Sequence, residues 1–218
     1  MKVKKSVFYI LMFLPLLVTL IVLQYLPEQI PAHYDFNNQV TRWGSKYETL
    51  ILPAITIFFG FFMLGMAKYS AKHEETGKNN ENIGIMTGIV SLVIFNAMTG
   101  YFLYTDFNKI ENLSSVTIDI NQLIFGIFGV SIIIIGNIMP KLRMNSCIGL
   151  RTNWSMKNET TWKKSQRFGG ISFIIVGIII LAVSFFIKGF ACVLLSLGIL
   201  LASLPIDIYY TYKVAKKY

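Results

Sequence analysis

The chain has 218 residues, of which 54% are hydrophobic and only 14% are charged, and its formal net charge is +9. A soluble domain carries about 25% charged residues, so these charges are too few to cover a surface that faces water. The apolar content is also far too high for a disordered chain, and the composition therefore indicates a membrane protein.

The charges are spaced so that six charge-free runs of 18 to 24 residues separate them. A helix needs about 20 apolar residues to cross the hydrocarbon core of a bilayer. The sequence thus predicts an all-α, polytopic bundle of six transmembrane helices near residues 7–26, 49–67, 83–104, 121–139, 168–187 and 189–210. The pattern disfavours a β-barrel, because segments such as Ile174–Ile180 are apolar throughout and do not alternate in polarity.

Six spans leave no room for a separate soluble domain, since the longest remaining stretch is 141–167. We predict two membrane halves of three helices each. The first is 1–110, with an outer loop at 27–48, and the second is 111–218, with a cytoplasmic loop at 140–167.

Lysine and arginine are unevenly distributed between alternate loops, with 16 on one side of the membrane and four on the other. Short loops rich in these residues stay in the cytoplasm, so both termini are predicted to be cytoplasmic. The same bias accounts for the positive net charge, which faces anionic lipid, and we do not expect direct binding of nucleic acid.

Signs of catalysis or metal binding are missing from the sequence. It contains no hydrolase, metalloprotease or nucleotide-binding motif, and we predict no catalytic residue, cofactor or metal site. His33 and His73 fall on opposite sides of the membrane, as do Cys147 and Cys192, so neither pair can meet. Asp207 is the one acid inside a predicted span, and we expect it to pair with a cation of 141–167.

The predicted outer loop contains two prolines, an Asn37-Asn38 turn and three aromatic side chains. Such a loop serves either as an aromatic belt at the outer interface or as a binding surface. The candidate ligand-binding residues in it are His33, Asp35, Arg42, Trp43 and Gly44.

The predicted cytoplasmic loop follows the fourth span. We expect Pro140 to end that span, Gly149 to permit a tight turn, and Ser155 to cap a short helix that contains Trp162. Trp154 and Trp162, with the cations around them, fit either an interfacial segment held at anionic headgroups or a specific binding surface.

The two loops together resemble a known family. The inner segment is similar to the motif of the SdpI-type immunity proteins of Gram-positive bacteria. The residues that carry this resemblance are Gly136, Asn137, Pro140, Arg143, Asn145, Gly149, Arg151, Thr152, Trp154, Trp162 and Arg167. Pro31, His33 and Asp35, with Arg42-Trp43-Gly44, are similar to the domain of unknown function that usually forms the N-terminal half of that family. The chain departs from the family at Ser165-Gln166, where a Thr-His pair is common, and at Asn38, where Gly is common.

The resemblance implies a multi-pass protein of the bacterial cell membrane that protects its producer from a secreted toxic peptide, bound at the outer face. It also implies a signalling role, in which the protein holds a cytoplasmic transcriptional repressor at the membrane. The alternative is a small transporter or exporter of a membrane-active peptide or lipid. We expect binding without catalysis, and contact of the basic face with anionic lipids.

Overall fold

The computed structural model describes residues 2–73, 77–117, 119–145 and 149–218, with only the backbone at 70–73 and 77–80. Six of its helices are long and apolar enough to cross a membrane, which confirms the predicted number of spans. They are α1 (Lys2–Val22), α2 (Ile51–His73), α3 (Gly77–Phe107), α4 (Ile120–Ile138), α5 (Glu159–Phe186) and α6 (Gly189–Lys217). Several helices run beyond the predicted bounds, because backbone hydrogen bonding continues past the last apolar residue.

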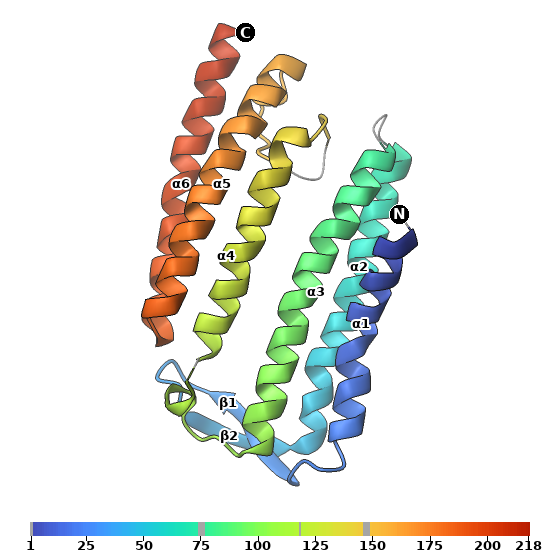
Figure 1. Cartoon of the computed structure of the whole chain (residues 1–218), viewed down its shortest axis with the longest axis vertical. Coiled ribbons are helices and arrows are strands. Elements are labelled where there is room, and N and C mark those ends of the chain that lie inside the picture. Colours follow the sequence, from blue (N-terminus) through green and yellow to red (C-terminus); the bar gives the residue numbers. More distant parts are fainter. Residues whose placement is uncertain (1, 74–76, 118, 146–148) are drawn as a thin grey trace.

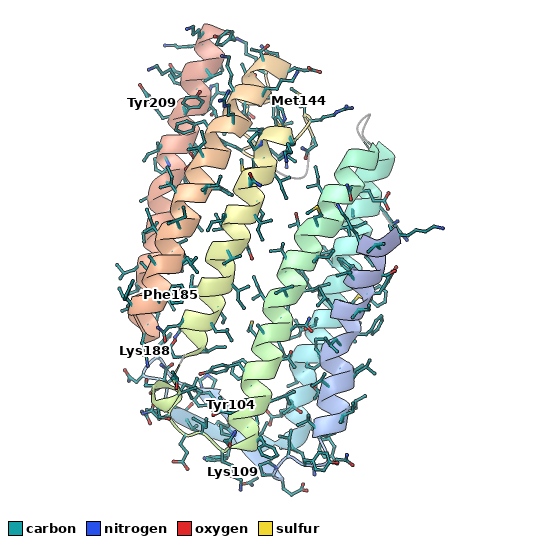
Figure 2. All side chains as sticks on the ribbon, viewed as in Figure 1. Tyr104, Lys109, Met144, Phe185, Lys188 and Tyr209 are labelled. Carbon is teal, nitrogen blue, oxygen red and sulfur yellow. The ribbon has the colours of Figure 1, made fainter. Side chains whose placement is uncertain are left out.

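The helices form two groups of three, α1–α3 and α4–α6, which touch through α3 and α4 (Figure 1). Both termini lie at one end of the bundle, which we call the terminus end, and β1 (Gln29–Tyr34) and β2 (Val40–Ser45) lie across the other, which we call the hairpin end. Tyr104, Lys109 and Lys188 mark the hairpin end, and Met144 and Tyr209 mark the terminus end (Figure 2).

Small residues bring the first three helices together. A Cβ atom placed on Gly60 of α2 would collide with Met12 of α1, and one on Gly88 of α3 would collide with Phe8. Phe8 and Met12 are fully buried, and they form one core with Leu64, Ile85 and Leu92. A Cβ on Gly84 would likewise lie 2.9 Å from the Cβ of Ala67 on α2, so Gly84 and Gly88 both serve close packing within the chain.

Glycines repeat every seven residues along the antiparallel contact of α4 and α5. A Cβ on Gly136 would lie 2.6 Å from the carbonyl oxygen of Gly170, and one on Gly129 would lie 2.9 Å from that of Gly177. One further repeat toward the hairpin end, the side-chain amide of Gln122 donates to the Ser184 carbonyl oxygen at 2.9 Å. This glycine seam lets the two backbones approach closely, as small residues do in membrane bundles.

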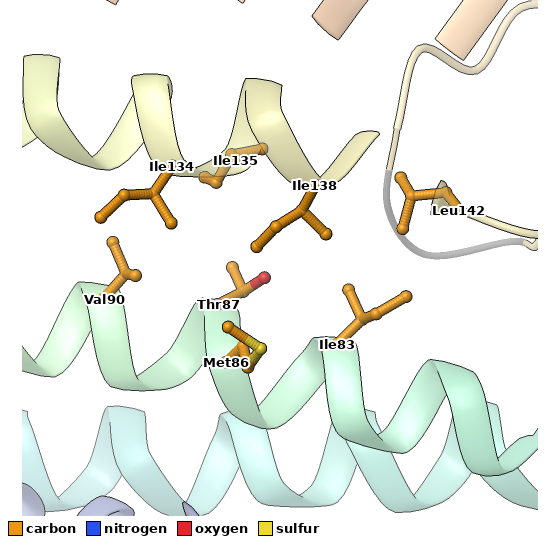
Figure 3. Close-up of a pocket in the computed structure, with 8 residues that line it drawn as sticks. All are labelled: Ile83, Met86, Thr87, Val90, Ile134, Ile135, Ile138 and Leu142. Atoms are coloured by element: carbon orange, nitrogen blue, oxygen red, sulfur yellow. The ribbon is translucent and has the colours of Figure 1, made fainter. Parts of the chain in front are cut away.

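The contact between the two groups of helices is apolar. Ile134, Ile135 and Ile138 of α4 face Ile83, Met86, Thr87 and Val90 of α3 (Figure 3). The cavity between them is about 30 Å³, with an almost wholly apolar lining. It is about the volume of one water molecule and offers too few polar partners to hold one.

A buried carboxylate ties the start of α4 to the turn between α5 and α6, at the hairpin end. Asp119 is fully buried and caps α4 by accepting from the Gln122 amide at 2.8 Å. Its second oxygen accepts from the amide of Gly189, at the turn from α5 to α6, at 2.5 Å. Both oxygens of this buried charge are thus satisfied, as buried polar groups require.

Candidate functional site

The predicted outer loop is a β-hairpin, which the sequence did not indicate. β1 and β2 are antiparallel, with Ile30 opposite Gly44 and Pro31 opposite Trp43, and the register shifts on both sides of His33. Segment 111–113 continues this structure: the Val40 amide donates to the Glu111 carbonyl oxygen, and the Leu113 amide donates to that of Asn38. The second loop of the hairpin end is therefore docked onto the first.

Asp35 and Asn38 shape the tip of the hairpin. One carboxylate oxygen of Asp35 accepts from the amides of Asn37 and Gln39, each at 2.9 Å. Asn38 has a φ of 64°, a left-handed conformation that asparagine tolerates better than most residues. The expected turn at Asn37-Asn38 is present, and Asp35 is committed to it.

The other motif residues of the hairpin also hold its shape. The guanidinium of Arg42 donates to both carboxylate oxygens of Glu48, at 3.0 and 2.7 Å. A Cβ on Gly44 would collide with the Glu48 carboxylate and lie 2.7 Å from the Cβ of Ala32, so a side chain there would displace Glu48 from this ion pair. His33 shares a hydrogen bond of 2.6 Å with the Thr41 hydroxyl. Trp43 is the exception, since its side chain is 40% exposed.

Two cavities adjoin β1 at the hairpin end. One, of about 290 Å³, lies between the hairpin and the ends of α2 and α3. The other, of about 480 Å³, lies between β1 and the second half, where the Phe36 and Phe190 rings pack at a tilt of 58° with centroids 5.3 Å apart. Ala32, Tyr34 and Phe102 line both. The hairpin thus forms a wall shared by two largely apolar hollows.

Tyr34 fastens this wall to the bundle. Its hydroxyl donates to the Ile110 carbonyl oxygen at 2.8 Å. Burial raises the pKa of Tyr34 to about 12, so the hydroxyl remains protonated and able to donate at any physiological pH.

At the terminus end, the segment after α4 turns back over the start of α5. The chain leaves α4 through a 3₁₀ turn at Met139–Lys141, so Pro140 ends the helix as predicted. Gly149 adopts a φ of +116°, which glycine alone adopts readily, and this confirms the predicted turn. The Gln166 side chain holds that turn by accepting from the Leu150 amide and donating to the Leu150 carbonyl oxygen, both at 3.0 Å.

Thr152 and Ser155 form a second closed turn. The amide of each donates to the hydroxyl of the other, at 2.8 and 3.0 Å, and the Thr152 hydroxyl also bonds to that of Thr211 on α6 at 2.9 Å. The prediction that Ser155 caps a short helix is wrong. Asn158 caps α5 instead, through a reciprocal box with Thr161, and Trp162 belongs to that long helix.

Two further predictions for this end are corrected by burial. Trp162 is 1% exposed, and its indole nitrogen donates to the Leu142 carbonyl oxygen at 2.8 Å, so it is a core residue and not an interfacial one. Asp207 is 1% exposed, and among the described residues neither of its oxygens has a hydrogen-bond partner. The expected ion pair is absent because α5 and α6 enclose the carboxylate away from the exposed cations.

The remaining inner motif residues divide into buried and exposed groups. Gly136 and Asn145 are buried, and the Asn145 side chain donates to the Arg143 carbonyl oxygen at 2.8 Å. Trp154 is partly exposed and packs edge-on against Tyr212. Exposed on the surface are Asn137, Pro140, Arg143, Arg151 and Arg167. In the part of the chain that the structure describes, the guanidinium groups of the three arginines make no hydrogen bond or ion pair.

Comparison with known proteins identifies the family. The chain is 30% identical to a protein of Bacillus subtilis (strain 168) named Immunity protein SdpI, over 98% of this chain and 97% of the relative. The chain belongs to the SdpI family. Residues 141–209 match the SdpI/YfhL protein family, and residues 10–57 match a domain of unknown function, DUF1648. No solved structure matches the chain. With its six spans, this SdpI family member is a multi-pass bacterial membrane protein.

The two matched segments lie in different halves of the SdpI-family chain, and neither reaches the predicted boundary at 110/111, which stays a prediction. Cys147 lies outside the described residues, and Cys192 is a buried free thiol. Among the described residues, no three His, Cys, Asp or Glu side chains gather closely enough to hold a metal ion.

Sequence reasoning missed one residue of the hairpin end. Asp106 lies in the last turn of α3, is 4% exposed, and lines the 290 Å³ cavity. The sequence shows it only as the acid that ends a charge-free run, and the predicted span stopped at residue 104. Its burial depends on the hairpin that packs over it, and the local sequence does not predict that contact.

Proposed function

We propose that this protein is a membrane immunity protein, which protects its cell from a secreted toxic peptide by binding the peptide at the hairpin end. The observation that carries the proposal is the pair of cavities that β1 separates, with their apolar linings. A membrane-active peptide is amphipathic, so such hollows suit it. The identity to Immunity protein SdpI over nearly the whole chain supports the same conclusion.

The hairpin end faces the outside in this proposal, because the lysine and arginine bias assigns the terminus end to the cytoplasm. Glu111→Cys and Lys163→Cys test this, since both side chains are exposed at opposite ends. In a Cys147→Ser background, an impermeant thiol reagent added to intact cells should label only Glu111→Cys. Labelling of Lys163→Cys alone would reverse the orientation.

Protection is tested in a B. subtilis strain that lacks its own SdpI and grows beside a strain that retains it. Expression of this chain should restore growth of the sensitive strain. Uptake and release of the peptide should also be measured in vesicles that contain the protein. Protection of cells without such transport would support binding and not export. Peptide flux that depends on the protein would favour a transporter.

A signalling role is proposed for the terminus end, on the strength of its exposed arginines. Arg143, Arg151 and Arg167 have no partner among the described residues, so their guanidinium groups are available to carboxylates or phosphates. A cytoplasmic repressor or the anionic headgroups of the inner leaflet would supply those groups. Co-purification of a repressor with the membrane fraction, only in peptide-treated cells, tests this role.

A further inference from the structure

Asp106 is a buried carboxylate that has no partner. It is 4% exposed, and within the described parts of the chain no hydrogen bond or ion pair reaches its side chain. Asp119, at the same end of the bundle, has both oxygens satisfied by backbone amides. Because an unsatisfied buried carboxylate is costly, a native one calls for an explanation.

Among the described residues that line the 290 Å³ cavity, Asp106 carries the one acidic or basic side chain that has no partner. The other two charged lining residues are Arg42 and Glu48, which are bound to each other through two hydrogen bonds. The rest of the wall is apolar or carries hydroxyl groups, and it includes Ile55, Phe102, Thr49 and Thr99. The site therefore combines one unpaired carboxyl group with an apolar passage.

These features select a ligand by its chemistry. A primary ammonium on a flexible apolar stem would place its charge at Asp106 and its stem along the apolar wall, as lysine side chains do at interfaces. The volume of about 290 Å³ is roughly ten times that of a water molecule, so the cavity has room for such a side chain. A metal ion would need several ligands, and one carboxylate does not supply them.

We infer that this cavity binds a primary ammonium group of the toxic peptide, either a lysine side chain or the N-terminus, with Asp106 as its counter-ion. The inference deepens the proposed function and rests on it. An amine headgroup of a lipid carries the same ammonium, but its phosphate would need a cation in the wall. Arg42 is the cation there, and Glu48 already holds it.

The route into the cavity also suits a peptide at the membrane surface. Ile51 and Ile55, at the start of α2, line the cavity and remain about half exposed. On a membrane-spanning helix these side chains face lipid, so the cavity borders the interfacial layer in which an amphipathic peptide lies.

The test uses the full chain in nanodiscs of phosphatidylcholine and phosphatidylglycerol, which contain no primary amine. The probe is a fluorescent amphipathic peptide with one lysine and a blocked N-terminus, and its twin has that lysine acetylated. The native protein should bind the probe at least tenfold more tightly than the twin, as expected for a hydrogen-bonded charge pair. In Asp106→Asn this preference should disappear.

Glu111→Gln is the matched control, because it removes one exposed negative charge from the same end without touching the cavity. It should keep the preference. Competition by free n-hexylammonium, but not by n-hexanol, tests the site in the native protein and needs no variant to fold. Equal binding of probe and twin, or retention of the preference in Asp106→Asn, would overturn the inference.

Two arms separate the inference from its alternatives. If phosphatidylethanolamine in the nanodiscs displaces the probe as n-hexylammonium does, the ammonium belongs to a lipid and the peptide assignment is wrong. If the native protein and Asp106→Asn protect cells equally, and neither protein prefers the probe over its acetylated twin, the inference fails and the proposed function stands. If the native protein prefers the probe but does not protect cells, ammonium binding in the cavity is supported and the proposed immunity function is rejected.

Discussion

The two ends of the bundle use their charged motif residues in opposite ways. At the hairpin end, Asp35 and Arg42 are committed to internal bonds that fix the fold. Asp106, outside the motif, is a buried carboxyl group without a partner among the described residues. At the terminus end, glycines, hydroxyl groups and Trp162 hold the fold, while Arg143, Arg151 and Arg167 are exposed. Membership of a motif therefore does not show whether a charged side chain is free to bind a ligand.

The framework role of the inner motif predicts the largest effect. Gly136→Val would drive a side chain against the Gly170 carbonyl oxygen, which is backbone and cannot move aside. We expect a loss of about 3 kcal/mol or more in the free energy of unfolding, and little protein in the membrane. Denaturation in micelles measures this. Gly198→Val is the matched control, since open space surrounds that position, and equal stability of the two variants would break the packing account.

The exposed arginines predict a loss of function without a loss of stability. Arg151→Lys should impair repressor recruitment or protection nearly as much as Arg151→Ala, by about 1.5–3 kcal/mol of binding, because lysine cannot reproduce a bidentate contact. Lys163→Arg, on the same face, should be silent. Membrane abundance and unfolding should be measured beside the functional assay. Full activity of Arg151→Lys would contradict a specific contact of the guanidinium group and would show that positive charge alone is sufficient on this face.

Trp43 tests whether the hairpin binds anything itself. Its side chain is partly exposed, and among the described residues its indole makes no hydrogen bond. Trp43→Ala should lower peptide affinity by about 2 kcal/mol, or roughly 30-fold, as loss of an aromatic anchor does. Titration of the protein with the toxic peptide measures the change. Unaltered affinity would leave Trp43 as part of an interfacial belt.

Asp35 predicts a smaller, local effect. Asp35→Ala removes the acceptor for the amides of Asn37 and Gln39, and should cost about 1 kcal/mol, concentrated at the hairpin tip. Hydrogen exchange of these two amides should speed up severalfold while exchange in α3 stays slow. If exchange at the tip does not change, the carboxylate does not hold the turn.

Sequence reasoning predicted the helices well because each span is a local property, namely a charge-free run long enough to cross the bilayer. The turns at Asn38 and Gly149 were predictable for the same reason, since each depends on one residue's backbone preference. The seven-residue glycine spacing from Gly129 to Gly136 and from Gly170 to Gly177 was also visible in the sequence, although its pairing was not.

What escaped prediction depends on contacts between distant segments. The hairpin is stabilised by 111–113, more than 60 residues from its tip, and its short strands contain a proline. Trp162 was predicted to lie at the membrane interface and Asp207 to pair with a cation of 141–167, yet the packing of α5 buries both. From the sequence alone Asp106 would be assigned to a loop, and its burial depends on the hairpin that packs beside it.

The central claim, that the toxic peptide binds at the hairpin end, is tested most directly by photo-cross-linking in protected cells. A benzoylphenylalanine would replace Tyr47, which is exposed beside the 290 Å³ cavity, or Tyr209, which is exposed near the terminus end. After irradiation, the account predicts a peptide adduct at position 47 and none at position 209. Adducts at position 209 alone, or protection with no adduct at position 47, would contradict it.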